Sequence, residues 1–319
     1  MRRLQGVAVL SGTLGLLILG FFGYLDWGDK IAARFGTTEE EPSGTGPFRV
    51  GVLGDSQKGL ANLRNITAAV LREKVRFLLH TGDLVSNNDQ GHYRLAVRFL
   101  TRGGAPCMPY VAPGNHDLKG GVELFRGWCD DLEKSFVRQG VAFVLMNNAF
   151  GNPVPDAKHV EERIAAAGPH QAVVLLMHQP PFDVQGNPVP GYEAFLAWLE
   201  KSKVAYLLCG HVHTYMKKKV GETTVIINGV GGDYDKWQLD QKVYATILDV
   251  DGATITDRRI ELEPVHEFWE NVEHLAVGHV AEAYRQKPTL CWLGTVLLAG
   301  ATGWAWSRLL KRPKIPRAA

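Results

Sequence analysis

The sequence predicts an α/β domain in the middle of a 319-residue chain, with an apolar segment near each end. Continuous apolar runs of strand length alternate with segments of helical periodicity between residues 49 and 261. Strands without a polar face are typical of sheets that are covered on both faces. The two apolar end segments are long enough to cross a membrane, so we expect them to lie outside this domain.

The strands and helices of the predicted domain follow one another along the chain. Seven apolar runs predict strands at residues 49–54, 75–82, 107–114, 141–147, 172–178, 204–210 and 223–229. Helical patterns cover residues 60–74, 92–102, 156–168 and 193–201. Residues 242–262 alternate in polarity around Asp251 and Gly252, which predicts a hairpin. A last helical pattern at residues 263–287 leads into the second apolar segment.

The two apolar end segments predict membrane spans. Each is uncharged over 20 residues, at positions 6–25 and 288–307. As a helix, each would reach about 30 Å, the thickness of the hydrocarbon core of a bilayer. Basic residues precede the first segment and follow the second, so the positive-inside tendency places both termini in the cytoplasm and the domain outside. A cleaved signal peptide and a buried core helix are the respective alternatives.

These features divide the chain into six parts. They are an N-terminal membrane anchor (1–25), a linker (26–47), the α/β domain (48–262), a juxtamembrane helix (263–287), a C-terminal transmembrane helix (288–307) and a basic tail (308–319). The expected location is therefore a membrane, with the domain on its extracytoplasmic side, either periplasmic or at the cell surface.

The composition excludes several classes of protein. The chain is 45% hydrophobic with a net charge of +2, so it is too apolar to be disordered and lacks the basic surplus of a nucleic-acid-binding protein. Its four cysteines show no CxxC spacing, which argues against a thiolate metal site. We expect small buried thiols, with a disulfide between Cys107 and Cys129 as the alternative in an oxidising compartment.

Ligand-type side chains follow most of the predicted strands. They are Asp55 and Gln57 after the first strand, Asp83 after the second, Asn115, His116 and Asp117 after the third, His178 after the fifth, and His211 and His213 after the sixth. In α/β sheets, ligands bind beyond the carboxyl ends of the strands, so these residues predict one shared metal site. Carboxylate, amide and imidazole ligands suit Mn, Fe or Zn, and two such ions can clamp both oxygens of a phosphoryl displacement.

The motifs that carry these residues occur in the order "GDSQ", "GDLVS", "GNHD", "MHQPP" and "GHVH". Their order and spacing resemble those of the calcineurin-like metallophosphoesterases, a family that includes the purple acid phosphatases. The resemblance covers roughly residues 49–232 and implies a β-sandwich flanked by helices. It also implies a hydrolase with a binuclear metal centre, at which metal-bound hydroxide attacks a phosphate mono- or diester.

The resemblance further implies a role for each site residue. One metal ion would be held by Asp55, Gln57, Asp83 and His213, and the other by Asp83, Asn115, His178 and His211. Asp83 would bridge the two ions, and His116 would stand at the leaving-group side as electrophile or general acid. Gln57 replaces a histidine that many members have, and Ser86 replaces an acid that orients the histidine equivalent to His116.

The remaining polar residues are expected to have smaller roles. We expect Asp117 to support a ligand or cap a turn, and His80 to lie partly buried in a strand. His92, His159 and His170 lie in polar surroundings, which predicts surface positions.

The leading hypothesis is a membrane-anchored two-metal phosphoesterase that acts on a phosphorylated small molecule or a lipid-linked phosphate. Gln57 and Ser86 suggest the alternative, a catalytically weak metal-binding sensor or binding protein on the same fold. A nuclease is disfavoured by the near-neutral net charge and by the expected extracytoplasmic location.

Overall fold

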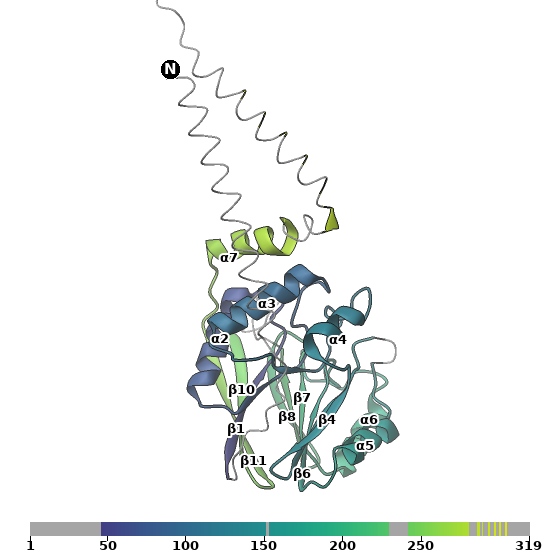
Figure 1. Ribbon diagram of the computed structural model, residues 1–319. Helices are drawn as coiled ribbons and strands as arrows, with labels where there is room; N and C mark the ends of the chain where they lie inside the picture. Colours follow the sequence, from purple (N-terminus) through teal and green to yellow (C-terminus); the bar gives the residue numbers. More distant parts are fainter. Residues whose placement is uncertain are drawn as a thin grey trace, which may run out of the picture.

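The computed structural model describes residues 46–150, 153–229 and 242–280, together with the single positions 286, 287, 289, 293, 297, 300 and 304. Within these residues the chain forms two mixed β-sheets flanked by helices (Figure 1). The predicted α/β class is therefore confirmed for the described part of the chain.

The first sheet has five strands in the order β11-β10-β1-β2-β3. Strands β1 (Phe48–Leu53), β2 (Phe77–His80) and β3 (Tyr110–Val111) run parallel. Strand β10 (Val243–Asp251) pairs antiparallel with β1 and with β11 (Thr254–Leu262), so the hairpin predicted from the Asp-Gly pair is confirmed.

The second sheet has six strands in the order β4-β5-β6-β7-β9-β8. Its four inner strands run parallel, and they are β5 (Val141–Leu145), β6 (Ala172–Leu176), β7 (Val204–Cys209) and β9 (Thr223–Asn228). The antiparallel edge strands are β4 (Lys134–Arg138) and β8 (Tyr215–Val220). Because the inner strands share one direction, their carboxyl ends lie at the same edge of the sheet.

Apolar side chains alternate between two cores along the strands. On β6, Val174 and Leu176 belong to the core between the two sheets. Their neighbours Val173 and Leu175 belong to the core that includes side chains of α5 and α6. Each sheet is thus covered by the other sheet on one face and by helices on the other, which accounts for strands without a polar face.

Helices from different parts of the chain cover the outer faces of the two sheets (Figure 1). The first sheet is covered by α2 (Leu60–Arg72), α3 (Gln90–Arg102) and α4 (Glu123–Cys129). The second sheet is covered by α5 (Ala157–Ala166) and α6 (Glu193–Lys201).

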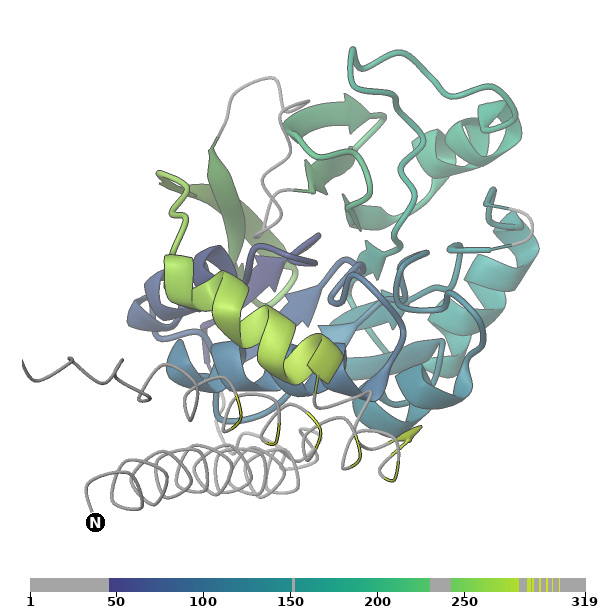
Figure 2. The ribbon, with the colours of Figure 1, turned by 90° about the horizontal axis from the view of Figure 1, so that it is seen from above.

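A C-terminal helical segment lies across α2 and α3 (Figures 1 and 2). It consists of α7 (Phe268–Glu273), which continues without a break as the π-helix η1 (His274–Val280). Glu267 pairs with Arg64 of α2 at 2.7 Å, and Glu273 pairs with Arg102 of α3 at 2.6 Å. The helix predicted from residue 263 therefore begins at Phe268, and ion pairs hold it to the domain.

Three elements were not predicted from the sequence: α4, β4 and β8. The strands β4 and β8 are edge strands with mixed polar residues, so their sequences lack a continuous apolar run. The predicted strand at residues 107–114 shortens to the two residues of β3, which Pro109 and Pro113 bracket. Proline has no N–H to contribute to the sheet, so each proline ends the pairing.

The membrane predictions fall almost entirely on residues that the structure does not describe. The first predicted span, residues 6–25, and the basic tail, residues 308–319, lie outside the described residues. The second predicted span is described only at residues 289, 293, 297, 300 and 304. In the described part of the chain, no helix is both long and apolar enough to cross a bilayer.

None of the three cysteines that the structure describes forms a disulfide bond. Cys129 and Cys209 are buried, as expected for small apolar side chains, and Cys107 is partly buried. No disulfide joins Cys107 to Cys129, so the alternative of a disulfide is not realised in the structure.

Candidate metal centre

Ligand-type residues from both sheets meet at one edge of the sandwich. In the first sheet, Asp55 follows β1, Asp83 follows β2 and Asn115 follows β3. In the second sheet, His178 follows β6 and His211 follows β7. Because these strands are parallel within each sheet, their carboxyl ends bring the five side chains to one place.

The tightest group consists of Asp83, Asn115, His178 and His211. Oδ1 of Asn115 lies 3.1 Å from Nε2 of His178 and 3.0 Å from Nδ1 of His211. The two imidazole nitrogens are 3.2 Å apart, and Nε2 of His178 lies 3.4 Å from Oδ2 of Asp83. Ligand atoms of Asp83, His178 and His211 all lie within 4.8 Å of one another. These four residues are the set predicted to hold one of the two ions.

The residues predicted to hold the other ion form two contacts, one between His213 and Asp55 and one between Gln57 and Asp83. Nε2 of His213 lies 3.6 Å from Oδ1 of Asp55. The side-chain amide of Gln57 donates a 2.7 Å hydrogen bond to Oδ2 of Asp83. Gln57 is therefore next to the carboxylate predicted to be shared, but it presents its nitrogen, and ligation of a metal ion would use the oxygen of the same amide.

The ring of His178 is oriented by the protein backbone. Its Nδ1 donates to the carbonyl oxygen of Thr81 at 2.9 Å, so Nε2 is the nitrogen that faces the group of ligands. Metal-ligating histidines usually donate their other ring N–H in this way, which fixes the tautomer. His178 thus has the second hydrogen bond that a metal ligand requires.

Asn148 holds the loop that carries His178, and sequence reasoning missed it. Its side chain is buried, and its Oδ1 accepts hydrogen bonds from the backbone N–H groups of His178 and Gln179 at 2.9 and 3.0 Å. Its Nδ2 donates to the carbonyl oxygen of Gln179 at 2.8 Å. The signal in the sequence was the pair of asparagines directly after an apolar run.

Asn228, at the end of β9, joins the two sheets beside the site. Its Nδ2 donates to the carbonyl oxygen of Val52 on β1 at 3.3 Å, and its Oδ1 accepts from the hydroxyl of Thr246 on β10 at 3.1 Å. It begins the glycine-rich segment 228–233, of which the structure describes only the first two residues.

Four site residues have a left-handed backbone conformation. The φ angle is +46° at Asp55, +32° at Gln57, +53° at Asp83 and +68° at His211. Such angles are uncommon outside glycine and cost on the order of 1 kcal/mol each. Only three other non-glycine residues of the described chain share this conformation. Backbone strain is therefore concentrated at this edge, as is typical of functional sites.

Two glycines allow the loops of the site to approach the carboxylates. A Cβ at Gly114 would collide with the backbone nitrogen and the carboxylate of Asp83. A Cβ at Gly210 would collide with Oδ2 of Asp55. Any side chain at either position would displace a carboxylate of the site.

Asp83 and His178 form a buried charged pair, since Asp83 is only 2% exposed and His178 is 0% exposed. Burial alone raises the pKa of Asp83, but the charge and hydrogen bond of His178 outweigh it and lower the pKa to about 2. Burial alone lowers the pKa of His178, but Asp83 outweighs it and raises the pKa to about 9. Asp83 is thus ionised at neutral pH, and a metal ion bound here would displace the proton of His178.

His116 lies next to this group, in the loop after β3. Its backbone N–H donates to Oδ1 of Asp83 at 2.8 Å, and its Nδ1 donates to the carbonyl oxygen of Ser86 at 2.9 Å. The hydroxyl of Ser86 is buried and has no hydrogen-bond partner in the structure. Ser86 therefore orients the imidazole through its backbone and not through its side chain.

Asp117 supports the loops beside the ligand group through hydrogen bonds to the backbone. It is fully buried, and its two oxygens accept from the backbone N–H groups of Val85 and Gly114 at 3.0 and 2.9 Å. Burial and the nearby charge of Asp83 raise its pKa to about 7. Asp117 thus ties the loop after β2 to the loop after β3.

His80 is more deeply placed than the sequence suggested, because it is fully buried. Its Nδ1 accepts from the backbone N–H of Gly82 at 3.2 Å, so its Nε2 carries the proton and donates to Oγ of Ser56 at 3.3 Å. The hydroxyl of Ser56 in turn donates to the carbonyl oxygen of Leu84 at 3.0 Å. This chain of hydrogen bonds ties the loop after β1 to the loop after β2.

The three histidines predicted to lie on the surface differ from one another. His92 is only 3% exposed, so that prediction was wrong for His92. Its polar neighbours in the sequence cap α3, and the C-terminal helix covers its ring. His159 and His170 are partly exposed, and they contact Glu133 and the carbonyl oxygen of Gly168.

The ligand atoms at the edge where the two sheets meet suit transition-metal ions. They supply carboxylate and amide oxygens and imidazole nitrogens without a thiolate, a combination that suits Mn, Fe or Zn. One ligand group is already assembled, and the second set adjoins it through Asp83 and Gln57. The arrangement can therefore hold metal ions beside the exposed ring of His211.

Comparisons with known proteins agree with this geometry. Residues 48–215, more than half of the chain, match the calcineurin-like phosphoesterase family. A probable cyclic nucleotide phosphodiesterase of Pseudoalteromonas sp. (strain SM9913) is 22% identical over 170 residues, which are 49% of this chain. The chain spans 63% of the length of that relative. The resemblance drawn from the five motifs is confirmed.

Two solved structures with a similar fold come from yellow lupin and from Plasmodium. The purple acid phosphatase PPD1 from seeds of yellow lupin (Lupinus luteus) has a TM-score of 0.50 at 15% identity, covering 73% of this chain and 56% of that chain. GAP50, the anchor in the inner membrane complex of Plasmodium, has a TM-score of 0.51 at 12% identity, covering 73% of this chain and 95% of that chain. At these identities the likeness concerns the fold alone.

Replacing Asn148 tests how the loop of His178 is held. Asn148→Ala leaves two buried backbone N–H groups without an acceptor, so we expect the free energy of unfolding to fall by about 1–3 kcal/mol. Urea unfolding of the purified chain measures this. The control is Asn187→Ala, because Asn187 is exposed and its side-chain amide donates to Asp183, four residues away. Equal stability of the two variants would contradict the role of Asn148.

Proposed function

This chain belongs to the calcineurin-like phosphoesterase family, and on that premise we propose that it is a membrane-anchored two-metal hydrolase of phosphate esters. The observation that carries the proposal is the group of Asp83, Asn115, His178 and His211 where the strands of both sheets end. A carboxylate, an amide and two imidazoles within contact distance are a ligand set for a metal ion, and phosphoester hydrolysis is the chemistry of the family.

We assign the ligands of the two ions as follows. One ion would be held by Asp83, Asn115, His178 and His211, and the other by Asp55, Gln57, Asp83 and His213. The shared position suits Asp83, because its Oδ1 accepts from the backbone N–H of His116 and its Oδ2 accepts from the side-chain amide of Gln57, a residue of the other ligand set. Bound Mn, Fe or Zn ions polarise phosphoryl oxygens and lower the pKa of water.

His116 is the residue that this chain offers to the leaving group. Because its Nδ1 donates to the carbonyl oxygen of Ser86, its Nε2 is the nitrogen left for the departing oxygen, and the imidazolium form of the ring would give its Nε2 proton to that oxygen. The backbone N–H of His116 also fixes the position of the ring relative to Asp83. His116 thus serves as the general acid in this proposal.

Phosphodiesters are the substrate class that we propose first. The distant relative from Pseudoalteromonas is named a probable cyclic nucleotide phosphodiesterase, which supports a cyclic nucleotide as the diester. A lipid-linked phosphate is the competing substrate, and it is supported by the membrane spans expected at both ends of the chain.

Gln57 and Ser86 favour a second candidate function, a metal-binding sensor with weak catalysis. Gln57 is neutral, and its nitrogen faces Asp83. The acceptor for Nδ1 of His116 is the neutral carbonyl oxygen of Ser86 and not a carboxylate. Both features weaken the electrostatic support that a fast hydrolase gives to its metals and to its general acid.

Removing the charge of Asp83 tests the hydrolase. With Mn²⁺, Zn²⁺ or Fe²⁺, we expect the detergent-purified chain to hydrolyse an aryl phosphodiester or monoester. We expect Asp83→Asn to lower kcat by more than about 100-fold, since even an outer partner of a metal ligand contributes 10–100-fold. The measurement is kcat and metal content for both proteins, and Asp131→Asn, at an exposed aspartate, is the control.

Two results would contradict the hydrolase. Full activity of Asp83→Asn would show that Asp83 is not part of the catalytic site. Two bound metal equivalents without turnover of any ester, including cyclic nucleotides and lipid phosphates, would favour the sensor.

Replacing His116 tests the general acid. We expect His116→Asn to lower kcat by on the order of 100-fold for an alkyl ester, whose leaving oxygen needs a proton. For a p-nitrophenyl ester, whose leaving group departs as an anion, the loss should be far smaller. The measurement is kcat of parent and variant on both esters at equal metal content, and equal losses on the two esters would assign His116 to binding instead.

We propose that the segments at residues 6–25 and 288–307 anchor the domain on the extracytoplasmic face of a membrane. Their uncharged length and the basic residues outside them support this. The outward side of the C-terminal helical segment adds support, because Phe268 is 71% exposed and Leu275 is 58% exposed. With Val272 they recur at helical spacing, and such an apolar stripe is typical of a helix at a membrane surface.

Reporter fusions test this orientation. In a bacterial host, alkaline phosphatase fused after residue 150 should be active, and β-galactosidase fused there should be inactive, because we expect this position to lie outside the cytoplasm. Fusions after residue 319 should show the opposite pattern and serve as the control. The opposite pattern at residue 150 would place the domain in the cytoplasm.

A further inference from the structure

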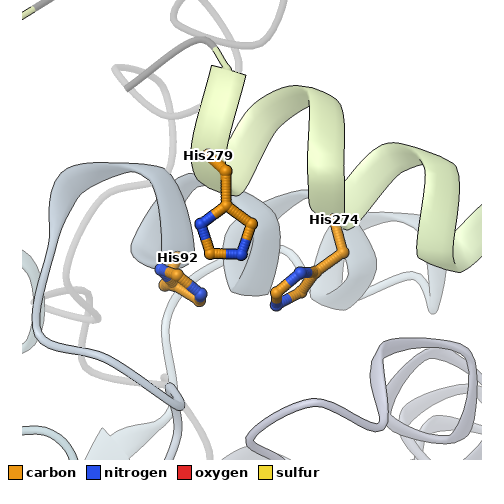
Figure 3. A group of neighbouring side chains, drawn as sticks. All are labelled: His92, His274 and His279. Atoms are coloured by element: carbon orange, nitrogen blue, oxygen red, sulfur yellow. The ribbon is translucent and has the colours of Figure 1, made fainter. Parts of the chain in front are cut away.

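Three histidines gather at a second place, between α3 and the C-terminal helical segment (Figure 3). His92 belongs to α3, and His274 and His279 belong to η1. The ring centroids are 5.0 Å apart for His92 and His274, 5.6 Å for His92 and His279, and 5.1 Å for His274 and His279. One ring nitrogen of each lies within 4.8 Å of the other two. We call these residues the three-histidine cluster.

His92 has the surroundings of a metal ligand. It is buried, and its Nδ1 lies 2.8 Å from both carboxylate oxygens of Asp89, the residue that also caps α3. A carboxylate behind an imidazole fixes the tautomer and raises the basicity of the other nitrogen. That nitrogen, Nε2, has only a long contact of 3.4 Å with Nδ2 of Asn87. An ion bound to this nitrogen would replace that long hydrogen bond from the amide of Asn87.

His274 carries an unexplained buried group. Its Nε2 is buried and has no hydrogen-bond partner in the structure. Leaving a polar atom in this state costs about 1–3 kcal/mol, so buried nitrogens of this kind are rare without a ligand. His279 is exposed, so solvent and ions can reach the cluster from the side of η1.

The winding of η1 brings His274 and His279 together. In an α-helix each residue turns by about 100°, so residues five apart would point in directions that differ by about 140°. A π-helix closes its hydrogen bonds between residues five apart, which places such a pair one above the other. The rare winding occurs where it aligns the two histidines, and π-helical turns are frequently found at functional sites.

Residues outside the three-histidine cluster hold the C-terminal helical segment against α2 and α3. Glu273, next to His274, pairs with Arg102 of α3 at 2.6 Å, and Glu270 of α7 accepts from the backbone N–H of Ala61 on α2 at 2.9 Å. These bonds fix η1 against α3 before any ion binds. A preformed ligand set loses little conformational entropy on binding, which favours affinity.

We propose that the three-histidine cluster binds one Zn²⁺ ion, which fastens the C-terminal helical segment to α3. Three neutral imidazoles with a supporting carboxylate are a common zinc ligand set, in which water takes the fourth position. The ion satisfies the buried nitrogen of His274 and links residues that are far apart in the sequence. The site is separate from the candidate metal centre and shares no residue with it.

Zinc content of four proteins tests the site apart from catalysis. The parent is the full-length Asp83→Asn protein in detergent, in which the candidate metal centre is weakened. After treatment with a chelator and re-equilibration with Zn²⁺, the parent should hold one more equivalent of zinc per chain than Asp83→Asn/His279→Ala. Asp83→Asn/His279→Gln should behave like the alanine variant. Asp83→Asn/His170→Ala replaces a partly exposed histidine elsewhere and should hold as much zinc as the parent.

Thermal unfolding of the same proteins tests the fastening. Zn²⁺ should raise the midpoint temperature of thermal unfolding of the parent, since an ion that binds only the folded chain stabilises it. The midpoint temperature of the His279 variants should stay unchanged. His279 is exposed, so the variants should unfold at the parent's midpoint in chelator. Equal zinc content in the parent and both His279 variants, or an equal loss in the His170 variant, would overturn the proposal.

Discussion

The burial of two carboxylates is the constraint on which the candidate metal centre depends. Asp55 and Asp83 lie almost completely buried at the edge where the two sheets meet. An ionised carboxylate taken out of water costs several kcal/mol unless charges and hydrogen bonds replace the water. Backbone N–H groups of His211 and His116 and the cationic ring of His178 supply part of that replacement. Metal ions would supply the rest, and the neighbouring nitrogen and oxygen donors are placed to share them.

The loops can supply these partners because the strands beneath them are rigid and parallel. Each loop leaves the end of a buried strand, and hydrogen bonds through Asn148, Asn228 and His80 tie it to its neighbours. The left-handed backbone at Asp55, Asp83 and His211 persists because these bonds fix it from several sides. A site built in this way is held in position before a ligand arrives.

The C-terminal helical segment connects this site to the end of the chain that is expected to enter the membrane. The loop that begins at Asp83 continues through Ser86, which holds His116, to Asn87 and Asp89, which contact His92. His92 packs against η1, and η1 precedes the second apolar segment of the sequence. One short stretch of chain therefore adjoins both the candidate metal centre and the three-histidine cluster.

The class of the fold and the composition of the candidate site follow from local patterns in the sequence. Apolar runs and helical periodicity are local properties, so they located seven of the strands and four of the helices. The residues after those strands gave the set from Asp55 to His213, since chain direction alone brings the ends of parallel strands together. Polar edge strands such as β4 carry no such local signal, and sequence reasoning missed them.

The contacts between groups that are distant in the sequence depend on the packing of the folded chain. Asn148 became a support of His178, Ser86 a backbone acceptor for His116, and His92 a buried partner of His274 and His279. None of these contacts follows from periodicity, because each joins segments whose approach depends on how the sheets and helices pack. Local sequence determines which side chains an element carries, and packing across the whole chain decides what each side chain meets.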